Sequence, residues 1–181
     1  MTQNIQTPPY TLEPDEKVVV VVIYTPGILF RGELIVKQII RVSTWLRTNT
    51  APDRICLYNA KALMTTSGGA GKPSHFSELH IAIKHIEAFH LLPPAKDPPD
   101  YDPSEPNRRM LPVTALLGSF RFDGNLRLST QSNLTKFLDI SRETFTPMYD
   151  SQVSNPLMPS IGVLSVAYLL IRQESCVFTI P

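Results

Sequence analysis

The feature that most constrains how this chain can fold is a similarity between its two halves. At a constant offset of 92 residues, Phe30-Arg31-Gly32-Glu33-Leu34 aligns with Phe122-Asp123-Gly124-Asn125-Leu126. With short gaps, the alignment continues through Val36 and Leu128, Val42 and Leu134, Trp45 and Phe137, Leu46 and Leu138, Leu57-Tyr58-Asn59 and Met148-Tyr149-Asp150, Ile83 and Ile171, and Pro93 and Pro181. Similarity at a fixed period is typical of a repeated structural unit. We therefore expect one small unit to be present twice.

Local signals in the first half predict the order strand, strand, helix, strand, strand. The β-branched run 18–24 and the segment 28–36 flank Thr25-Pro26-Gly27, which has the residue types of a tight turn. From 38 to 48 the apolar residues recur at helical spacing, which predicts a short amphipathic helix. The expected remainder is a strand at 54–63, a loop at Ser67-Gly68-Gly69-Ala70-Gly71-Lys72, and a strand pair at 79–92 that breaks near Lys84-His85.

The second half repeats this order. Strands are expected at 111–117 and 120–128, around a Gly118-Ser119 turn. A helix is expected at 132–140 with Ser132 as its N-cap, followed by a strand at 145–153. The apolar stretch 163–180 is too long for one strand, so we expect a break near Arg172-Gln173-Glu174.

These elements predict a mainly β fold with short helices (α+β), arranged as two tandem small β-barrels of the SH3/Sm-like kind. Closing a small curled sheet removes its exposed edges. Units of about 75 residues are marginal alone, so we expect the copies to pack on each other, related by pseudo-twofold symmetry. Trp45 and Phe137 are expected at equivalent positions, each on the helix face that packs against its own sheet.

The strand Phe145-Thr146-Pro147-Met148-Tyr149-Asp150-Ser151-Gln152-Val153, with the preceding Gly124-Asn125-Leu126 and the Leu134 and Phe137-Leu138 helix, resembles a small uncharacterised bacterial β-β-α-β-β domain family. That family has an F-x-P-L-x-D-x-x-V strand. The first half has Arg54 and Cys56 where the pattern has Phe and Pro. The hairpin from Leu170-Ile171-Arg172 to Cys176-Val177 is also similar to the closing strands of Sm-like RNA-binding barrels. The resemblance implies two tandem copies of the fold and no catalytic residue.

Proline-rich, acidic segments divide the chain. We expect an extended N-terminal tail at 1–16, a first repeat at 17–93, a linker at 94–109 and a second repeat at 110–181. The stretch 93–106 carries six prolines among Asp and Glu residues, a composition typical of a semi-rigid, solvated spacer.

Composition predicts a cytoplasmic protein with buried partner contacts. Hydrophobic residues make up 43% of the chain and charged residues only 18%, which leaves apolar surface to cover. The first residues lack a secretory signal pattern, and the stretch 161–171 is shorter than the roughly 20 residues of a membrane span. Cys56 and Cys176 are interpreted as reduced, buried residues, although the sequence leaves open whether they meet.

No residue pattern in the chain predicts catalysis, a cofactor or a metal. His75, His80, His85 and His90 have a spacing of five, which aligns four ligands on neither a strand nor a helix. The segment Ser67–Lys72 fails the phosphate-loop pattern, because Pro73 stands where Ser or Thr is needed. No Gly-x-Ser-x-Gly elbow is present, so we expect the protein not to be an enzyme.

Charge is distributed unevenly between the halves. Residues 17–93 contain nine basic and four acidic residues, whereas 110–181 contain five of each, and the whole chain has a net charge of +1. The candidate contacts for an anionic partner are Lys37, Arg41, Arg47 and Arg54. The alternative is a solvated basic face that the acidic tail and linker balance.

Two functional hypotheses follow. The first is a non-enzymatic protein-interaction or scaffold protein, either a homo-oligomer or a subunit of a larger complex. The second is a nucleic-acid-binding module that uses the basic first repeat, whose binding would weaken steeply with salt.

Overall fold

The computed structural model describes residues 8–48, 50–66 and 69–181, and these residues are mainly β. The first half contains β1 (Glu16–Thr25), β2 (Ile28–Lys37), α1 (Val42–Trp45), β3 (Arg54–Thr66), β4 (Gly69–Ala70), β5 (Ser74–Ala82), the 3-10 turn η1 (Ile83–His85) and β6 (Ala88–Leu91). The second contains β7 (Arg108–Leu117), β8 (Phe120–Ser129), α2 (Leu134–Ile140), β9 (Phe145–Ser154), η2 (Pro159–Ile161), β10 (Leu164–Arg172), η3 (Gln173–Ser175) and β11 (Val177–Thr179). Residues 1–7 of the predicted tail, and Ser67 and Gly68 of the predicted loop, lie outside the described residues.

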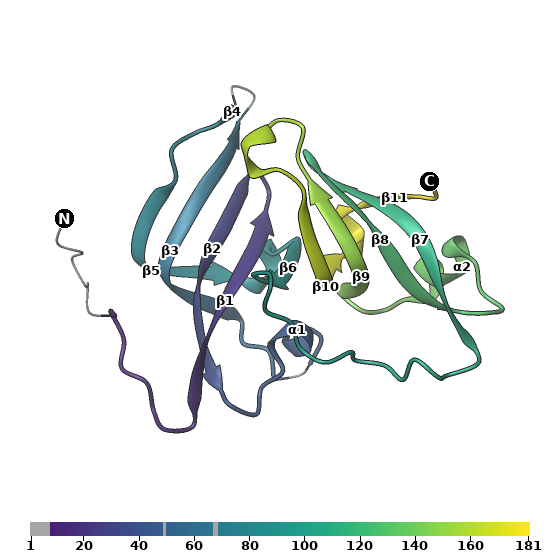
Figure 1. The fold of residues 1–181 in the computed structure, drawn as a ribbon, viewed down its shortest axis with the longest axis horizontal. Coiled ribbons are helices and arrows are strands. Elements are labelled where there is room, and N and C mark those ends of the chain that lie inside the picture. The colour runs from purple at the N-terminus through teal and green to yellow at the C-terminus, as the bar shows by residue number, and fades with distance from the viewer. Residues whose placement is uncertain (1–7, 49, 67–68) are drawn as a thin grey trace.

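The described strands join one antiparallel sheet. Its order is β11-β7-β8-β9-β10-β6-β1-β2-β3, and β3 pairs further with both β4 and β5. Figure 1 shows the strands of the first half in purple and blue beside those of the second half in green and yellow, with β6 and β10 between the two groups. β-branched residues in β1 and two-residue turns after β1 and β7 account for the long hairpins that begin each half.

The two halves have the same strand order. Residues 17–93 run β5-β3-β2-β1-β6 across the sheet, and residues 110–181 run β10-β9-β8-β7-β11. In both, a 3-10 turn separates the fourth long strand from the short last strand, which returns to pair with the first. The predicted breaks near Lys84-His85 and Arg172-Gln173-Glu174 fall at these two turns.

Irregular positions in the strands also correspond. The register shifts at Gly32 in β2 and at Gly124 in β8, which are 92 residues apart. A Cβ atom on Gly32 would lie 2.9 Å from the Cβ of Leu57, so this crossing requires glycine. In the facing strands, Asn59 and Asp150 both have φ near 48°. The sequence alignment is therefore in register through β3 and β9.

The alignment is wrong further along the chain. Tyr58 pairs with Glu78 and Tyr149 pairs with Tyr168, so β5 and β10 correspond at an offset of 90 residues. This places Ile81 with Ile171, not Ile83. The long β3–β5 hairpin of the first half hides the offset, because sequence alone does not show where its loop residues belong.

Both helices are shorter than predicted. The helix expected at 38–48 is only Val42–Trp45, and that expected at 132–140 begins after Asn133, whose side chain accepts a hydrogen bond from the Lys136 N–H. The N-cap is thus Asn133 and not Ser132. Trp45 and Phe137 lie at equivalent positions and pack at the margins of separate core clusters, as predicted.

The expectation of two closed barrels related by a pseudo-twofold axis is wrong. Within the described residues β5 pairs only with β3, and β6 pairs instead with β1 and with β10 of the other half. The junction therefore joins two strands that hold different places in their halves, whereas a twofold contact joins equivalent ones. The physical reason is that β10 occupies the side of β6 that β5 would need in order to close the first half.

Two hydrophobic clusters fill the interior. One is built mainly from β1, β2, β3 and β6, and the other mainly from β7, β8, β9 and β10. Each receives side chains across the junction: Leu170 and Phe145 enter the first, while Tyr24 and Ala88 enter the second. Burial at the junction thus links two otherwise distinct cores.

Candidate functional site

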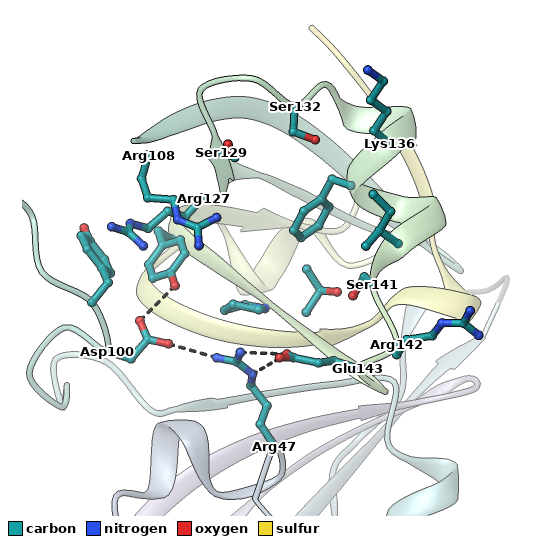
Figure 2. Close-up of a pocket in the computed structure, with 16 residues that line it drawn as sticks. Arg47, Asp100, Arg108, Arg127, Ser129, Ser132, Lys136, Ser141, Arg142 and Glu143 are labelled. Atoms are coloured by element: carbon teal, nitrogen blue, oxygen red, sulfur yellow. Dashed lines mark hydrogen bonds and ion pairs between the residues drawn. The ribbon is translucent and has the colours of Figure 1, made fainter. Parts of the chain in front are cut away.

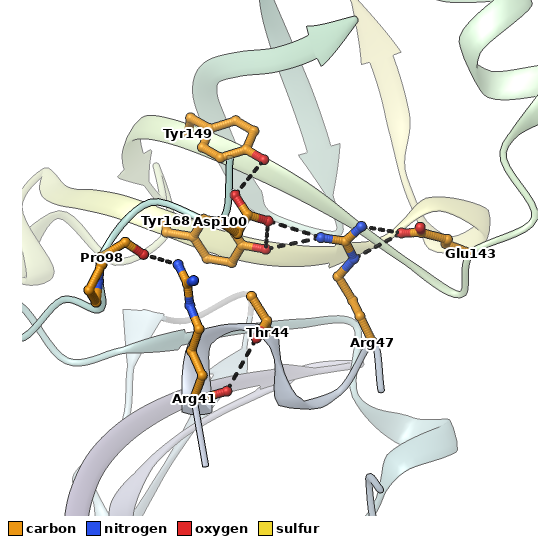
Figure 3. A network of polar contacts seen from close by, with 8 residues as sticks. All are labelled: Arg41, Thr44, Arg47, Pro98, Asp100, Glu143, Tyr149 and Tyr168. Atoms are coloured by element: carbon orange, nitrogen blue, oxygen red, sulfur yellow. Dashed lines mark hydrogen bonds and ion pairs between the residues drawn. The ribbon is translucent and has the colours of Figure 1, made fainter. Parts of the chain in front are cut away.

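The linker is fastened to both halves by a polar network around Asp100 (Figure 3). One carboxylate oxygen accepts a hydrogen bond from the Tyr149 hydroxyl at 2.9 Å. The other accepts from the Tyr168 hydroxyl at 3.0 Å and from the Arg47 guanidinium at 3.1 Å. Arg47 also pairs with Glu143 at 2.8 Å. Asp100 and Arg47 are largely shielded from water, so the network holds Arg47 of the first half against β9 and β10.

The protonation states in this network are those of a structural contact. Burial, reinforced by the negative charge of Asp100, raises the pKa of both Tyr149 and Tyr168 far above the usual range of tyrosine. Both phenols therefore remain hydrogen-bond donors. The Asp100 carboxylate accepts from these two hydroxyls and from the Arg47 guanidinium. The oxygens of Asp100 are therefore already engaged in contacts within the protein.

A cleft of about 750 Å³ lies beside this network, between the linker, α2 and β9 (Figure 2). Its walls are basic, hydroxylic and aromatic, and include Arg108, Arg127, Lys136, Arg142, Ser129, Ser132, Ser141, Thr146, Tyr101, Tyr149 and Phe137. The Arg127 guanidinium carbon lies 4.6 Å from the centre of the Tyr101 ring, and Glu105 binds both Arg127 and Arg108. Within the described part of the chain, Lys136 and Arg142 have no acidic partner.

The candidate anion contacts predicted from the sequence do not form one site. Lys37 is bound by Glu13 and Asp15 of the tail at 2.6 and 3.0 Å, which raises the pKa of its ammonium group. Arg41 donates to the Pro98 carbonyl of the linker, and Arg47 belongs to the Asp100 network. Arg54 lies in a separate hollow near Tyr10 and Glu78. The acidic tail and linker therefore neutralise much of the basic first half.

Sequence reasoning missed the basic residues of the cleft. Arg127, Lys136 and Arg142 lie in the segment 110–181, which has zero net charge, and Arg108 lies just before it, so the charge of each repeat did not point to them. The one available clue was the acidic linker itself, because a run of Asp and Glu residues between two folded segments can bind arginines on both.

Among the described residues, one group of side chains has ligand atoms close enough to share a cation. These atoms, from Cys56, Glu78 and His80, lie within 4.8 Å of one another on β3 and β5. Glu78 accepts a hydrogen bond from the His80 ring at 2.7 Å, and burial raises the pKa of the Cys56 thiol, which disfavours the thiolate. Cys56 and Cys176 are both free thiols.

The junction between the halves contains two buried polar side chains. His90 of β6 accepts a hydrogen bond from the Tyr24 hydroxyl at 3.1 Å, since its other ring nitrogen donates to the Leu91 carbonyl at 2.7 Å. Burial lowers the pKa of His90 to about 4. Arg172 of β10 crosses the junction and donates to the carbonyls of Ile86 and Ile83 at 2.8 and 2.7 Å. These contacts fix how the halves meet.

Apart from the two-residue β4, two strands of the sheet have one strand partner each among the described residues. β5 pairs with β3, and β11 pairs with β7. Exposed apolar side chains lie on these strands or on the strands next to them: Phe76, Leu116 and Val177, with Ile180 just beyond β11. Comparison of the chain with protein families, with curated proteins and with solved structures finds no match. No helix among the described residues is long and apolar enough to cross a membrane.

Proposed function

We propose that this protein is a non-enzymatic interaction or scaffold protein, acting as an oligomer or as a subunit of a larger assembly. The observation that carries this proposal is the pair of outer strands, β5 and β11. Each has a row of backbone groups without a strand partner among the described residues, and exposed apolar side chains lie beside both. Such edges template pairing with another chain unless they are blocked by charge, proline or a covering element.

The proposal includes the tandem architecture. Equal strand order, equivalent glycine positions and equivalent positive φ angles support the inference that the halves are two copies of one SH3/Sm-like unit. Each copy is then an open, curled sheet that its neighbour completes. The division into repeats at 17–93 and 110–181 and the cytoplasmic location stay predictions from the sequence.

The chemistry of the cleft supports a role without catalysis. Its most shielded carboxylate, Asp100, is fully engaged by Arg47, Tyr149 and Tyr168. The hydroxyl groups of Ser129, Ser132 and Ser141 lie in the cleft without a histidine among its lining residues to activate them. The residues present there favour binding over bond cleavage.

The experiment is light scattering on the purified protein over a range of micromolar concentrations, with hydrogen exchange measured at each end of that range. Association that slows amide exchange in β5 or β11 supports the proposal, because those amides are protected only when a partner strand is added. A protein that stays monomeric, with unprotected outer strands and no partner in pull-downs, contradicts it.

A second candidate function is nucleic-acid binding, and the basic cleft favours it. Arg108, Arg127, Lys136 and Arg142 provide phosphate contacts, and Tyr101 provides a ring for stacking. Single-stranded RNA is the probe. Changing Lys136 and Arg142 to Glu should abolish salt-sensitive binding, whereas the same change at Lys37, which the acidic tail already binds, should have little effect. RNA binding that is absent at low salt excludes this function.

A further inference from the structure

The junction inside the chain shows how two of these sheets pair. In it, β6 lies antiparallel to β10, with Ala88 opposite Ile171, Phe89 opposite Leu170 and His90 opposite Leu169. β6 is the last strand of the first half, and β10 is the fourth long strand of the second half. The contact is therefore head to tail: it uses a different edge from each half.

The two outer edges of the sheet correspond to the two edges that pair at the junction, and among the described residues neither outer edge has a further strand partner. In its half, β11 holds the place of β6: Ala88 pairs with Tyr24 of β1, and Val177 pairs with Leu116 at the corresponding position of β7. Likewise β5 holds the place of β10, with His80 corresponding to Leu170 and Leu79 to Leu169. One copy of the chain thus carries one edge of each kind.

Several residues that are buried at the internal junction have counterparts at the outer edges that are exposed to water, as expected for edges without a partner. Tyr24 and Ala88, beside the internal junction, are 2% and 0% exposed, whereas their counterparts Leu116 and Val177 are 41% and 65% exposed. On the other edge, Leu169 of β10 is fully buried and its counterpart Leu79 of β5 is half-buried. These apolar side chains stay in water only as long as nothing covers the two ends of the sheet.

The free backbone groups point outward at matching positions. The Ile83 N–H bonds to the Asp53 carbonyl, so alternation along β5 turns the N–H and C=O of His80 away from β3. The Arg172 N–H bonds to the Glu87 carbonyl, so in the internal junction Phe89 and Leu170 exchange backbone hydrogen bonds. Phe178, the counterpart of Phe89, therefore has its backbone groups turned away from β7.

We propose that β11 of one copy of this protein pairs with β5 of the next copy, in the register of the internal junction. Phe178 then lies opposite His80, Val177 opposite Ile81, and Thr179 opposite Leu79. The inference rests on the proposed function and names the partner as a second copy of this chain. Because each copy offers both edges, the contact is heterologous and repeats until a ring closes.

A second copy fits these edges through continuity with the pairing already present. The residues that face each other across the proposed contact are counterparts of residues that already pair within the chain. A twofold contact, β11 with β11 or β5 with β5, has no such precedent in the described structure. An unrelated extended peptide would use one edge and leave the other exposed.

Disulfide trapping tests the register. In a background with Cys56→Ser and Cys176→Ala, a Thr179→Cys protein is mixed with a Leu79→Cys protein and oxidised. Counterparts of these residues form a pair without mutual backbone hydrogen bonds, the closest spacing in an antiparallel ladder. We expect about tenfold more mixed disulfide than with a His80→Cys protein, whose side chain points to the opposite face. Trapping of Thr179→Cys with itself, or equal yields for the two partners, overturns the proposal.

A matched pair of variants tests the backbone contact. His80→Pro removes the outward N–H of β5, while His80→Ala keeps it, and light scattering measures association for both. We expect His80→Pro to weaken association at least about tenfold, from the loss of one hydrogen bond and added steric conflict, and His80→Ala to change it little. Circular dichroism checks that both fold.

The two proposals fail differently. Self-association that His80→Pro leaves intact, with trapping between equivalent strands, overturns the head-to-tail contact but keeps an interaction function. If the protein stays monomeric and a different protein protects its outer strands, the head-to-tail contact is likewise overturned and the interaction function is kept. A monomer whose outer strands nothing protects overturns both.

Discussion

The internal junction and the outer edges of the sheet use the same kinds of strand but different side chains. At the junction Leu170 is buried, and its counterpart at the outer edge is the exposed His80. Arg172, which donates to two carbonyls across the junction, has Ala82 as its counterpart. Leu91 is buried beside the junction, whereas Ile180 is 59% exposed.

This difference reflects how permanently each contact forms. The junction joins segments of one chain, so its effective concentration is high and it can contain groups such as Arg172 and His90 that are costly to leave unpaired. An edge that is at times in water needs polar residues such as His80 to remain soluble. The comparison therefore predicts a permanent contact within the chain and a reversible one between chains.

The largest expected effect separates the two regions directly. Phe89 is fully buried at the junction, and its counterpart Phe178 is only partly buried. Phe89→Ala should lower the free energy of unfolding by about 3–5 kcal/mol, and Phe178→Ala by about 1 kcal/mol. Denaturant unfolding of dilute protein measures both. Equal losses would show that β11 is as integral to the monomer as β6.

Removing the arginine that crosses the junction should have the next largest effect. Arg172 donates to the Ile83 and Ile86 carbonyls and lies 4.7 Å from the Phe145 ring centre. Arg172→Met keeps much of the volume but leaves both carbonyls without this donor, so we expect a loss of about 3 kcal/mol. Ala82→Met, the matched change at the outer edge, should leave unfolding of the dilute protein nearly unchanged.

Acid should weaken the junction through His90. Its pKa is lowered to about 4 in the folded protein from 6.5 in an unfolded chain, so the unfolded state binds the proton more readily between these values. Stability is then greatest above the unfolded pKa and falls with decreasing pH, by about 2 kcal/mol between about pH 7 and pH 5. His90→Gln should remove most of this slope. Comparing the two proteins cancels the carboxylates, and identical slopes would exclude His90 as the cause.

Much of the strand order within each half could be predicted from the sequence, because turn residues and β-branched runs are local signals. The breaks near Lys84-His85 and Arg172-Gln173-Glu174 fell at the two 3-10 turns. Closure could not be predicted: whether the second side of β6 pairs with β5 or with β10 depends on contacts between residues about 80 positions apart in the sequence. The short length of the first helix could not be predicted either. Its N-cap residue makes no capping hydrogen bond, and the Ser43 N–H donates instead to Asp97 of the linker at 2.9 Å.

The candidate sites were less predictable than the fold. Net charge pointed to the first half, but ion pairs depend on geometry that composition does not contain. Lys37 and Arg47 are bound by acidic residues of the tail and linker, while Lys136 and Arg142 of the neutral half line the cleft. The outer edges could not be predicted either, because their identity depends on the pairing of β6 with β10.

The smallest expected effect concerns the linker, which fastens the junction in a way that no outer edge can match. Asp100 accepts from Arg47 of the first half and from Tyr149 and Tyr168 of the second. Asp100→Asn keeps the shape but removes the charge and replaces one acceptor with a donor. We expect a loss of about 1 kcal/mol, because the ion pair is partly solvated and the tyrosines can keep one acceptor.

Proteolysis of the linker measures this last effect more sensitively than global unfolding does. If Asp100 holds the linker down, Asp100→Asn should speed cleavage near Lys96, while Asp102→Asn, an exposed change two residues away, should not. Unchanged cleavage in both would mean that the remaining contacts, such as Asp97 with Ser43, suffice to hold the linker. The junction would then depend on the β6–β10 pairing and on Arg172 alone. Only these contacts would distinguish it from the outer edges.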